Sequence, residues 1–172
     1  MKEIEYLSFL VLLSNIGFAA VVLFWRRASK LFSLYALDLA LVVSLAATFG
    51  SLLLSEYLLL PPCKLCWIQR VFMYPLAVIF VVAKFRKTPK IWEIVLPLVV
   101  IGAGFAIFHY YLQFAPNSGG VTCGTVGISA SCSEREFTHF GYITIPWMAL
   151  SAFAWIGVLM ASLKNHSTGK AK

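Results

Sequence analysis

The sequence predicts an all-α, polytopic membrane protein: a four-helix transmembrane bundle with one extra N-terminal transmembrane helix. Of the 172 residues, 60% are hydrophobic and only 12% are charged, whereas a soluble domain has about 25% charged residues. A soluble chain of this length could not bury so much apolar surface. Five separate apolar stretches are also long enough to cross a hydrocarbon core of ~30 Å, which needs roughly 20 residues per helix. We therefore expect the lipid bilayer to surround this chain.

The first two spans are predicted at residues 6–25 and 34–54. The first has no charged residue, and the second has only Asp38, near its start. A secretory signal peptide is the alternative for the first stretch. Its leading residues are not basic, however, and arginines follow it where a small-residue cleavage site would be expected. We therefore expect a helix that is retained.

The remaining three spans are less uniform. The third opens with Gln69 and Arg70, the fourth carries His109 near its end, and the fifth has no charge. No repeat or linker interrupts the chain, so we expect a single integral membrane domain over residues 1–172. The three predicted spans are residues 67–83, 91–114 and 142–163, and the loops before the third and the fifth are residues 55–66 and 115–139.

The lysines and arginines predict the orientation of the chain in the membrane. Ten of them flank one side of the five spans and four the other, so the positive-inside rule makes the richer side cytoplasmic. This places the chain in a bacterial cell membrane with its N-terminus outside and its C-terminus inside. Few aromatic residues are interleaved with the basic ones, which argues against nucleic-acid binding. The richer side has Arg26, Arg27, Lys30, Lys84, Arg86, Lys87, Lys90, Lys164, Lys170 and Lys172.

Four cysteines fall in the two loops expected on the outer face. Cys63 and Cys66 form a C-x-x-C motif ahead of the third span, and Cys123 and Cys132 lie in the longest polar loop. An oxidising outer face permits disulfides. Purely structural disulfides are one interpretation, but a C-x-x-C ring closes too short a loop to restrict the unfolded chain much. A zinc site would favour C-x(2–4)-C spacing in both pairs, so we expect no metal.

The surroundings of the C-x-x-C motif favour redox chemistry. Pro62 suits the beginning of a helix, so Cys66 is expected near a helix N-terminus, where exposed N–H groups favour a thiolate. Arg70 follows one turn later on the same face. A charge inside the membrane is costly and is functional by default, although Arg70 could instead extend to lipid headgroups as an anchor. The arrangement indicates electron transfer between thiols and an acceptor dissolved in the membrane.

These motifs resemble the DsbB/BdbC family of disulfide bond formation proteins, which are quinone-dependent membrane thiol oxidases. The resemblance rests on the run CKLCWIQRVFMYP at residues 63–75, on HYYLQ at 109–113, on the second cysteine pair and on FGYITIP at 140–146. It extends from about Ser33 to Leu163 and is nearer the Gram-positive BdbC branch. The family usually has four helices, so the first span is extra, and its role is left open.

The resemblance implies that the protein reoxidises an extracytoplasmic thioredoxin-fold thiol oxidase of the DsbA/BdbD kind. The electrons would pass to membrane quinone, either ubiquinone or menaquinone. By resemblance, Cys123 forms the mixed disulfide with the partner and Cys132 exchanges with Cys63, which leaves Cys66 beside the quinone. His109 could contact the quinone or relay protons, or equally bond a backbone carbonyl or a headgroup. The residues expected at the quinone are Cys66, Arg70, His109 and Gln69.

Three other functions compete with this one. A vitamin K epoxide reductase-like quinone reductase also has four helices and a C-x-x-C motif. Its motif lies late in the core helices, however, whereas here the motif opens the second core helix. A transmembrane thiol-reductant conduit would need cysteines open to the cytoplasm. A non-enzymatic membrane subunit with structural disulfides predicts that Cys63→Ser and Arg70→Ala affect stability alone.

Overall fold

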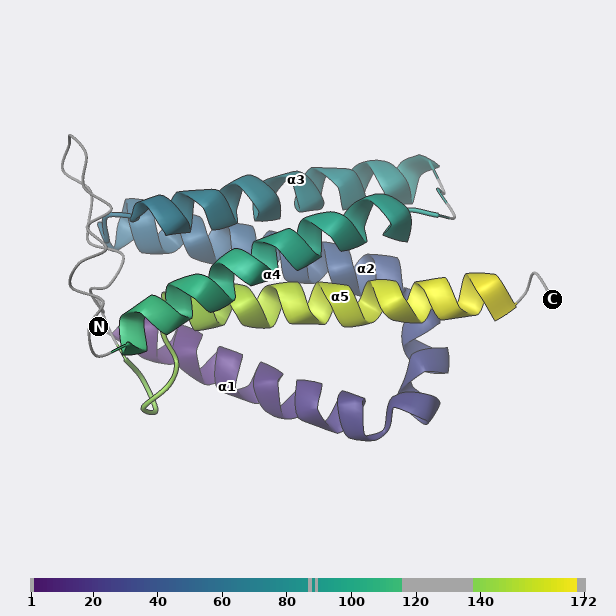
Figure 1. Ribbon diagram of the computed structural model, residues 1–172, viewed down its shortest axis with the longest axis horizontal. Coiled ribbons are helices and arrows are strands. Elements are labelled where there is room, and N and C mark those ends of the chain that lie inside the picture. The colour runs from purple at the N-terminus through teal and green to yellow at the C-terminus, as the bar shows by residue number, and fades with distance from the viewer. Residues whose placement is uncertain (1, 87, 89, 116–137, 170–172) are drawn as a thin grey trace.

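The computed structural model describes residues 2–86, 88, 90–115 and 138–169, so Cys123 and Cys132 lie outside the described residues. Five helices are long and apolar enough to cross a membrane, which confirms the predicted all-α, polytopic fold. The described residues form no strand, apart from an isolated bridge between His139 and Ile143. The helices are α1 (Lys2–Leu23), α2 (Trp25–Leu52), the short π-helix η1 (Leu53–Tyr57), α3 (Lys64–Arg86), α4 (Trp92–Phe114) and α5 (Ile145–Gly169) (Figure 1).

The chain runs back and forth along one axis, so that alternate connections meet at the same end. The α2–α3 and α4–α5 connections lie at the end that also holds the N-terminus, and the α1–α2 and α3–α4 connections lie at the other end (Figure 1). Helices α2 to α5 pack as a bundle. Helix α1 runs along the side of this bundle, against α2 and α5.

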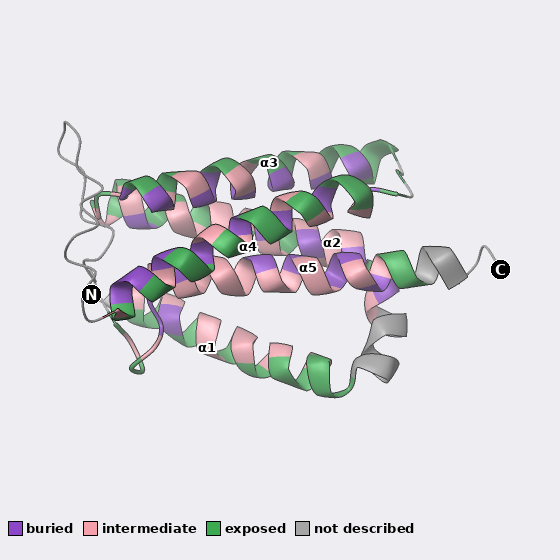
Figure 2. Cartoon of the chain, viewed as in Figure 1, coloured by how far each residue is buried: buried purple, intermediate pink, exposed green. Residues whose placement is uncertain are grey.

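The core lies between α2, α3, α4 and α5. Figure 2 shows its buried residues as stripes along the inner faces of these helices, whereas α1 is exposed on one side and half-buried on the other, with Ser8 its one buried residue among those described. In lipid, exposed apolar side chains are expected, and close packing rather than burial from water holds helices together. The largest fully buried core side chains are Leu76, Phe80, Val95, Phe153, Ile156, Leu159 and Met160.

The helices extend beyond the predicted spans in two places. The basic stretch after the first span is not a loop, because α2 already begins at Trp25 and only Phe24 separates it from α1. The predicted loop 55–66 is also too long, since η1 continues to Tyr57 and α3 begins at Lys64. Hydropathy falls wherever charged or polar residues begin. A helix can nevertheless continue past the hydrocarbon core, because long side chains reach water or headgroups.

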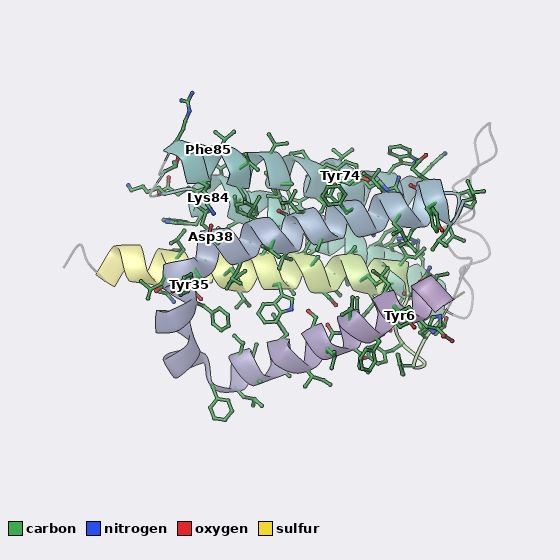
Figure 3. The ribbon with its side chains drawn as sticks, turned by 180° about the vertical axis from the view of Figure 1, so that it is seen from behind. Tyr6, Tyr35, Asp38, Tyr74, Lys84 and Phe85 are labelled. Atoms are coloured by element: carbon green, nitrogen blue, oxygen red, sulfur yellow. The ribbon has the colours of Figure 1, made fainter. Side chains whose placement is uncertain are left out.

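Charged side chains gather at the end of the bundle away from Cys63. Lys84 Nζ lies 2.5 Å from Asp38 Oδ1, and Lys90 Nζ lies 4.0 Å from Glu93 Oε1. Figure 3 shows the first pair at the end opposite Tyr6. Exposed pairs of this kind contribute little stability, about 0–1 kcal/mol. They mark this end as the polar, basic one.

The α4–α5 contact generates a stability prediction. A Cβ at Gly102 would lie 2.5 Å from Phe153 Cζ, whereas a Cβ at Gly104 would meet nothing within 4 Å. Both changes to alanine replace a glycine that weakens the helix. The difference in stability between the two variants therefore measures the cost of the clash with Phe153. We expect Gly102→Ala to be less stable than Gly104→Ala by about 1–3 kcal/mol, the usual cost of overpacking. Thermal unfolding in detergent measures this, and equal midpoints would contradict the packing described.

Candidate functional site

A tight turn places the C-x-x-C motif at the start of α3. Leu59 has a left-handed backbone (φ 54°), which is uncommon for a residue with a side chain, and Pro61 and Pro62 then restrict the chain to an extended path. The Cys63 carbonyl accepts the Trp67 N–H at 3.1 Å. The Cys63 sulfur accepts the Cys66 N–H at 3.4 Å. Cys63 therefore acts as the N-cap of α3, with sulfur in the place of the usual oxygen.

The two sulfurs lie together but in different surroundings. Cys63 Sγ is 3.2 Å from Cys66 Sγ, so the two are not joined in a disulfide. Cys63 is buried, with 4% of its surface exposed, whereas Cys66 is half-buried in the first turn of α3. A disulfide has an S–S distance of about 2.05 Å, so the pair can close with little movement. Only Cys66 combines partial exposure with the N–H-rich start of a helix.

His109 of α4 joins the cysteine pair to a buried polar cluster. Its Nε2 lies 3.6 Å from Cys63 Sγ, and its Nδ1 lies 3.2 Å from Gln69 Nε2. An amide nitrogen can only donate, so this contact makes Nδ1 the acceptor and leaves the proton on Nε2, facing the sulfur. His109 is 2% exposed. The sequence singled out His109 and Gln69, but it did not predict that they contact each other or that His109 contacts Cys63.

Arg70 is buried and held by Ser51 of α2. Its Nε donates to Ser51 Oγ at 2.9 Å, and its Nη2 donates to the Ser51 carbonyl oxygen at 3.0 Å. The guanidinium also lies 5.2 Å from the centre of the Trp67 ring. Ser51 was not among the residues predicted at the site. Ser51 lies near the end of α2, and Arg70 lies near the start of α3, which runs antiparallel to α2. The two residues are therefore at the same depth, and this is the signal that could have identified Ser51.

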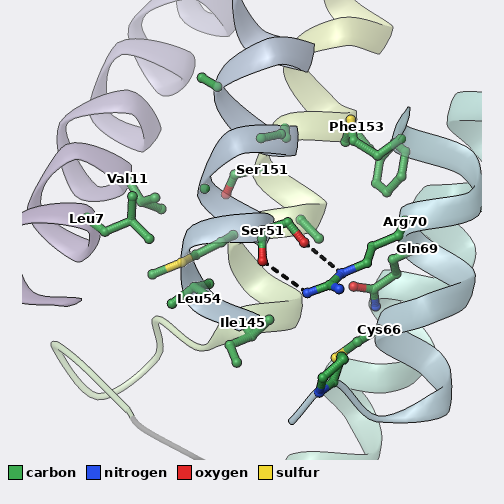
Figure 4. Close-up of a pocket in the computed structure, with 18 of the residues that line it drawn as sticks. Leu7, Val11, Ser51, Leu54, Cys66, Gln69, Arg70, Ile145, Ser151 and Phe153 are labelled. Carbon is green, nitrogen blue, oxygen red and sulfur yellow. Dashed lines mark hydrogen bonds between the residues drawn. The ribbon is translucent and has the colours of Figure 1, made fainter. Parts of the chain in front are cut away.

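A cavity of about 320 Å³ opens beside this cluster. The cysteine pair, Gln69, Arg70 and His109 line its polar end, and mostly apolar side chains, largely from α1, α2 and α5, line the rest. Figure 4 shows Arg70, Gln69 and Cys66 on one side, facing Leu7 and Val11 across Ser51. A small-molecule site of this size is usually apolar with a few placed polar groups. A quinone, with a flat polar ring and an apolar chain, fits this distribution.

Comparison with known proteins identifies the family. The family model described as disulfide bond formation protein DsbB matches residues 33–163, which is most of the chain. The chain belongs to the DsbB family. This membership confirms the resemblance noted in the sequence and supports a role in disulfide bond formation. The match begins within α2, so helix α1 lies outside it.

Curated relatives agree with the family model. The chain is 41% identical over 127 residues to disulfide bond formation protein C of Bacillus subtilis, covering 74% of this chain and 91% of the relative. It is 40% identical to a probable disulfide formation protein C 1 of Bacillus anthracis, covering 72% and 88%. It is 38% identical to a probable disulfide formation protein of Coxiella burnetii, covering 72% and 84%. No solved structure matches the chain.

The same DsbB-family site also places three potential metal ligands together. The ligand atoms of Cys63, Cys66 and His109 all lie within 4.8 Å of one another. Two thiolates and an imidazole are a donor set that zinc accepts. The expectation of no metal rested on cysteine spacing alone and did not consider His109, so it stays a prediction.

The surroundings of Cys63 shift its pKa in this DsbB-family pair. The hydrogen bond with Cys66 and burial raise the pKa of the Cys63 thiol to about 12, while the His109 contact opposes that rise. A thiol with this pKa is protonated throughout the neutral range. Cys63 is therefore a poor nucleophile in the reduced pair, and Cys66 is the sulfur placed to react first.

The raised pKa of Cys63 predicts the effect of removing the Cys66 sulfur. In Cys66→Ala the largest cause of the raised pKa is lost, so the pKa of Cys63 should fall below about 12. Iodoacetamide alkylation of Cys63 should then become faster at a given pH, because only the thiolate reacts. The rate across pH 7–11 is followed by mass spectrometry, with Cys63→Ala reporting the reactivity of Cys66. An alkylation profile of Cys63 that is unchanged by Cys66→Ala would refute the coupling of the two sulfurs.

Proposed function

We propose that this protein is a membrane thiol:quinone oxidoreductase. It would reoxidise an extracytoplasmic thioredoxin-fold thiol oxidase and pass the electrons to membrane quinone, either ubiquinone or menaquinone. The observation that carries the proposal is that Cys66 belongs both to the cysteine pair and to the wall of the cavity that holds Arg70. Both sulfurs of the redox pair thus line a mostly apolar ligand site.

Each polar side chain has a task in this function. Arg70 would bind a ring oxygen of the quinone, because its two bonds to Ser51 use Nε and Nη2 and leave Nη1 without a hydrogen-bond partner among the described residues. His109 Nε2 holds Cys63 in position and stabilises negative charge on that sulfur. Gln69 fixes the orientation of the His109 ring. A bound quinone supplies the acceptor for two electrons and two protons.

Electrons would enter through the second cysteine pair. The family resemblance assigns the mixed disulfide with the partner to Cys123 and the exchange with Cys63 to Cys132. Two electrons and two protons leave the partner dithiol, which becomes a disulfide, and reduce the Cys123–Cys132 bond. Thiol–disulfide exchange then passes them to the Cys63–Cys66 bond, through attack of a thiolate on a disulfide sulfur. The reduced Cys63–Cys66 pair finally transfers them to the quinone.

The proposed location follows from the two ends of the bundle. The described basic side chains Lys84, Arg86, Lys90 and Lys164 lie at or near the ends of helices that point away from Cys63 and Cys66. The positive-inside rule would then put the cysteine end on the outer face of a bacterial cell membrane, with the N-terminus outside. A thiol oxidase working outside the cytoplasm could reach the cysteines there.

Turnover with purified protein tests the function. The detergent-solubilised protein is mixed with a reduced thioredoxin-fold dithiol protein and a soluble quinone, and quinone absorbance is followed. We expect catalytic quinone loss that falls by about 100-fold or more in Cys66→Ser, as for removal of a covalent nucleophile. Ser162→Ala is the control, because its hydroxyl donates to the Val158 carbonyl of its own helix and Ser162 does not line the cavity.

Two results would contradict the proposal. Normal turnover in Cys66→Ser would show that another sulfur faces the acceptor. No turnover by the folded wild-type protein, with several dithiol partners and with both quinone types, would favour structural disulfides or a different acceptor.

A further inference from the structure

Helix α1 is the element that family membership does not explain. It lies outside the residues that match the family model, and it contributes few residues to the buried core. Most of its large apolar side chains are exposed, as lipid-facing residues are. Its inner face nevertheless has defined contacts with the bundle.

Polar contacts fix how α1 sits on α5. The Trp155 indole N–H donates to Ser14 Oγ at 2.8 Å, and Ser151 Oγ is hydrogen-bonded to Asn15 Oδ1 at 2.9 Å. The Phe18 ring meets Trp155 edge-on, with 5.3 Å between the ring centres. Hydrogen bonds between membrane helices stabilise their association. Together these contacts set both the distance of α1 from the bundle and its rotation.

That rotation turns one stripe of α1 toward the cavity. Leu7, Val11 and Ser14 follow the i, i+4, i+7 spacing of a single helix face, and all three line the cavity that contains Cys66 and Arg70. Figure 4 shows Leu7 and Val11 across the cavity from Arg70. The facing stretch of α2 carries small side chains, and a Cβ at Gly50 would be 4.0 Å from Leu7 Cδ1. Small residues on α2 thus leave open space that α1 covers.

We infer that α1 forms the outer wall of a channel for the isoprenoid chain of the quinone. The inference rests on the proposed function. One cavity joins a polar end, at Cys66 and Arg70, to a mostly apolar end between α1, α2 and α5, where the hydroxyls of Ser14 and Ser151 are engaged in hydrogen bonds between α1 and α5. A ring bound at the polar end must extend its chain from there, and the apolar end is continuous with it. Helix α1 would shield that chain from bulk lipid, which favours quinones with long chains over short ones.

Photolabelling of the intact protein tests this wall directly. The probe is a quinone with a diazirine at the end of its isoprenoid chain, added to the protein in lipid nanodiscs, and the labelled peptides are identified by mass spectrometry. We expect label on the α1 peptide, removed by excess unlabelled long-chain quinone. Val11→Trp should reduce this label at least about fivefold, because an indole fills the channel. Ile16→Trp, on the exposed face of α1, should not. Val11→Phe is the milder variant if the tryptophan prevents folding.

The outcomes separate this inference from the proposed function. If excess quinone removes label from α3 or α5 and no label falls on α1, the role of α1 is overturned. The proposed thiol:quinone function would then still stand. Label on α1 that unlabelled quinone does not remove, and that a diazirine phospholipid reproduces, would show a lipid acyl chain there and overturn the inference. No competed label anywhere in the folded protein would count against quinone binding itself.

Discussion

The buried positive charge of Arg70 is the constraint on which the site depends. Placing a guanidinium among membrane helices costs roughly 2.5–3.5 kcal/mol on insertion scales. Its bonds to the side chain and the backbone of Ser51 offset part of this cost. Those two bonds also fix the register between α2 and α3. The charge therefore determines how the two helices that flank the cavity are placed, and it brings a fixed hydrogen-bond donor beside Cys66.

The start of α3 gives two neighbouring sulfurs different chemistry. Cys63 caps the helix, is buried, and has its pKa raised to about 12 by the hydrogen bond with Cys66 and by burial. Cys66 is half-buried and lines the cavity. His109 and Gln69 extend the polar cluster from α4 back to α3. Both sulfurs line the cavity, so under the proposed function the redox pair lies directly against the ligand site.

Residue patterns within single segments were predictable, and contacts between segments mostly were not. The five spans, the position of Cys66 at a helix start and the shared face of Cys66 and Arg70 all follow from local spacing. The bonds from Arg70 to Ser51 and from His109 to Gln69 depend on how neighbouring helices are rotated and on their relative depth, which hydropathy does not encode. The same holds for the contact of α1 with Trp155. The helical start of α2 at Trp25 was missed because charge was taken to end a span.

The central claim is that Arg70 is retained to bind the acceptor rather than to stabilise the fold. Equilibrium binding of a quinone to the purified Arg70→Met variant tests it most directly, with thermal unfolding measured on the same samples. Methionine keeps an unbranched apolar stem and removes a costly buried charge, so stability should be unchanged or higher. The account predicts that the quinone dissociation constant rises by about tenfold or more, the equivalent of about 1.4 kcal/mol. An unchanged dissociation constant in a folded variant would make Arg70 a membrane anchor and contradict the account.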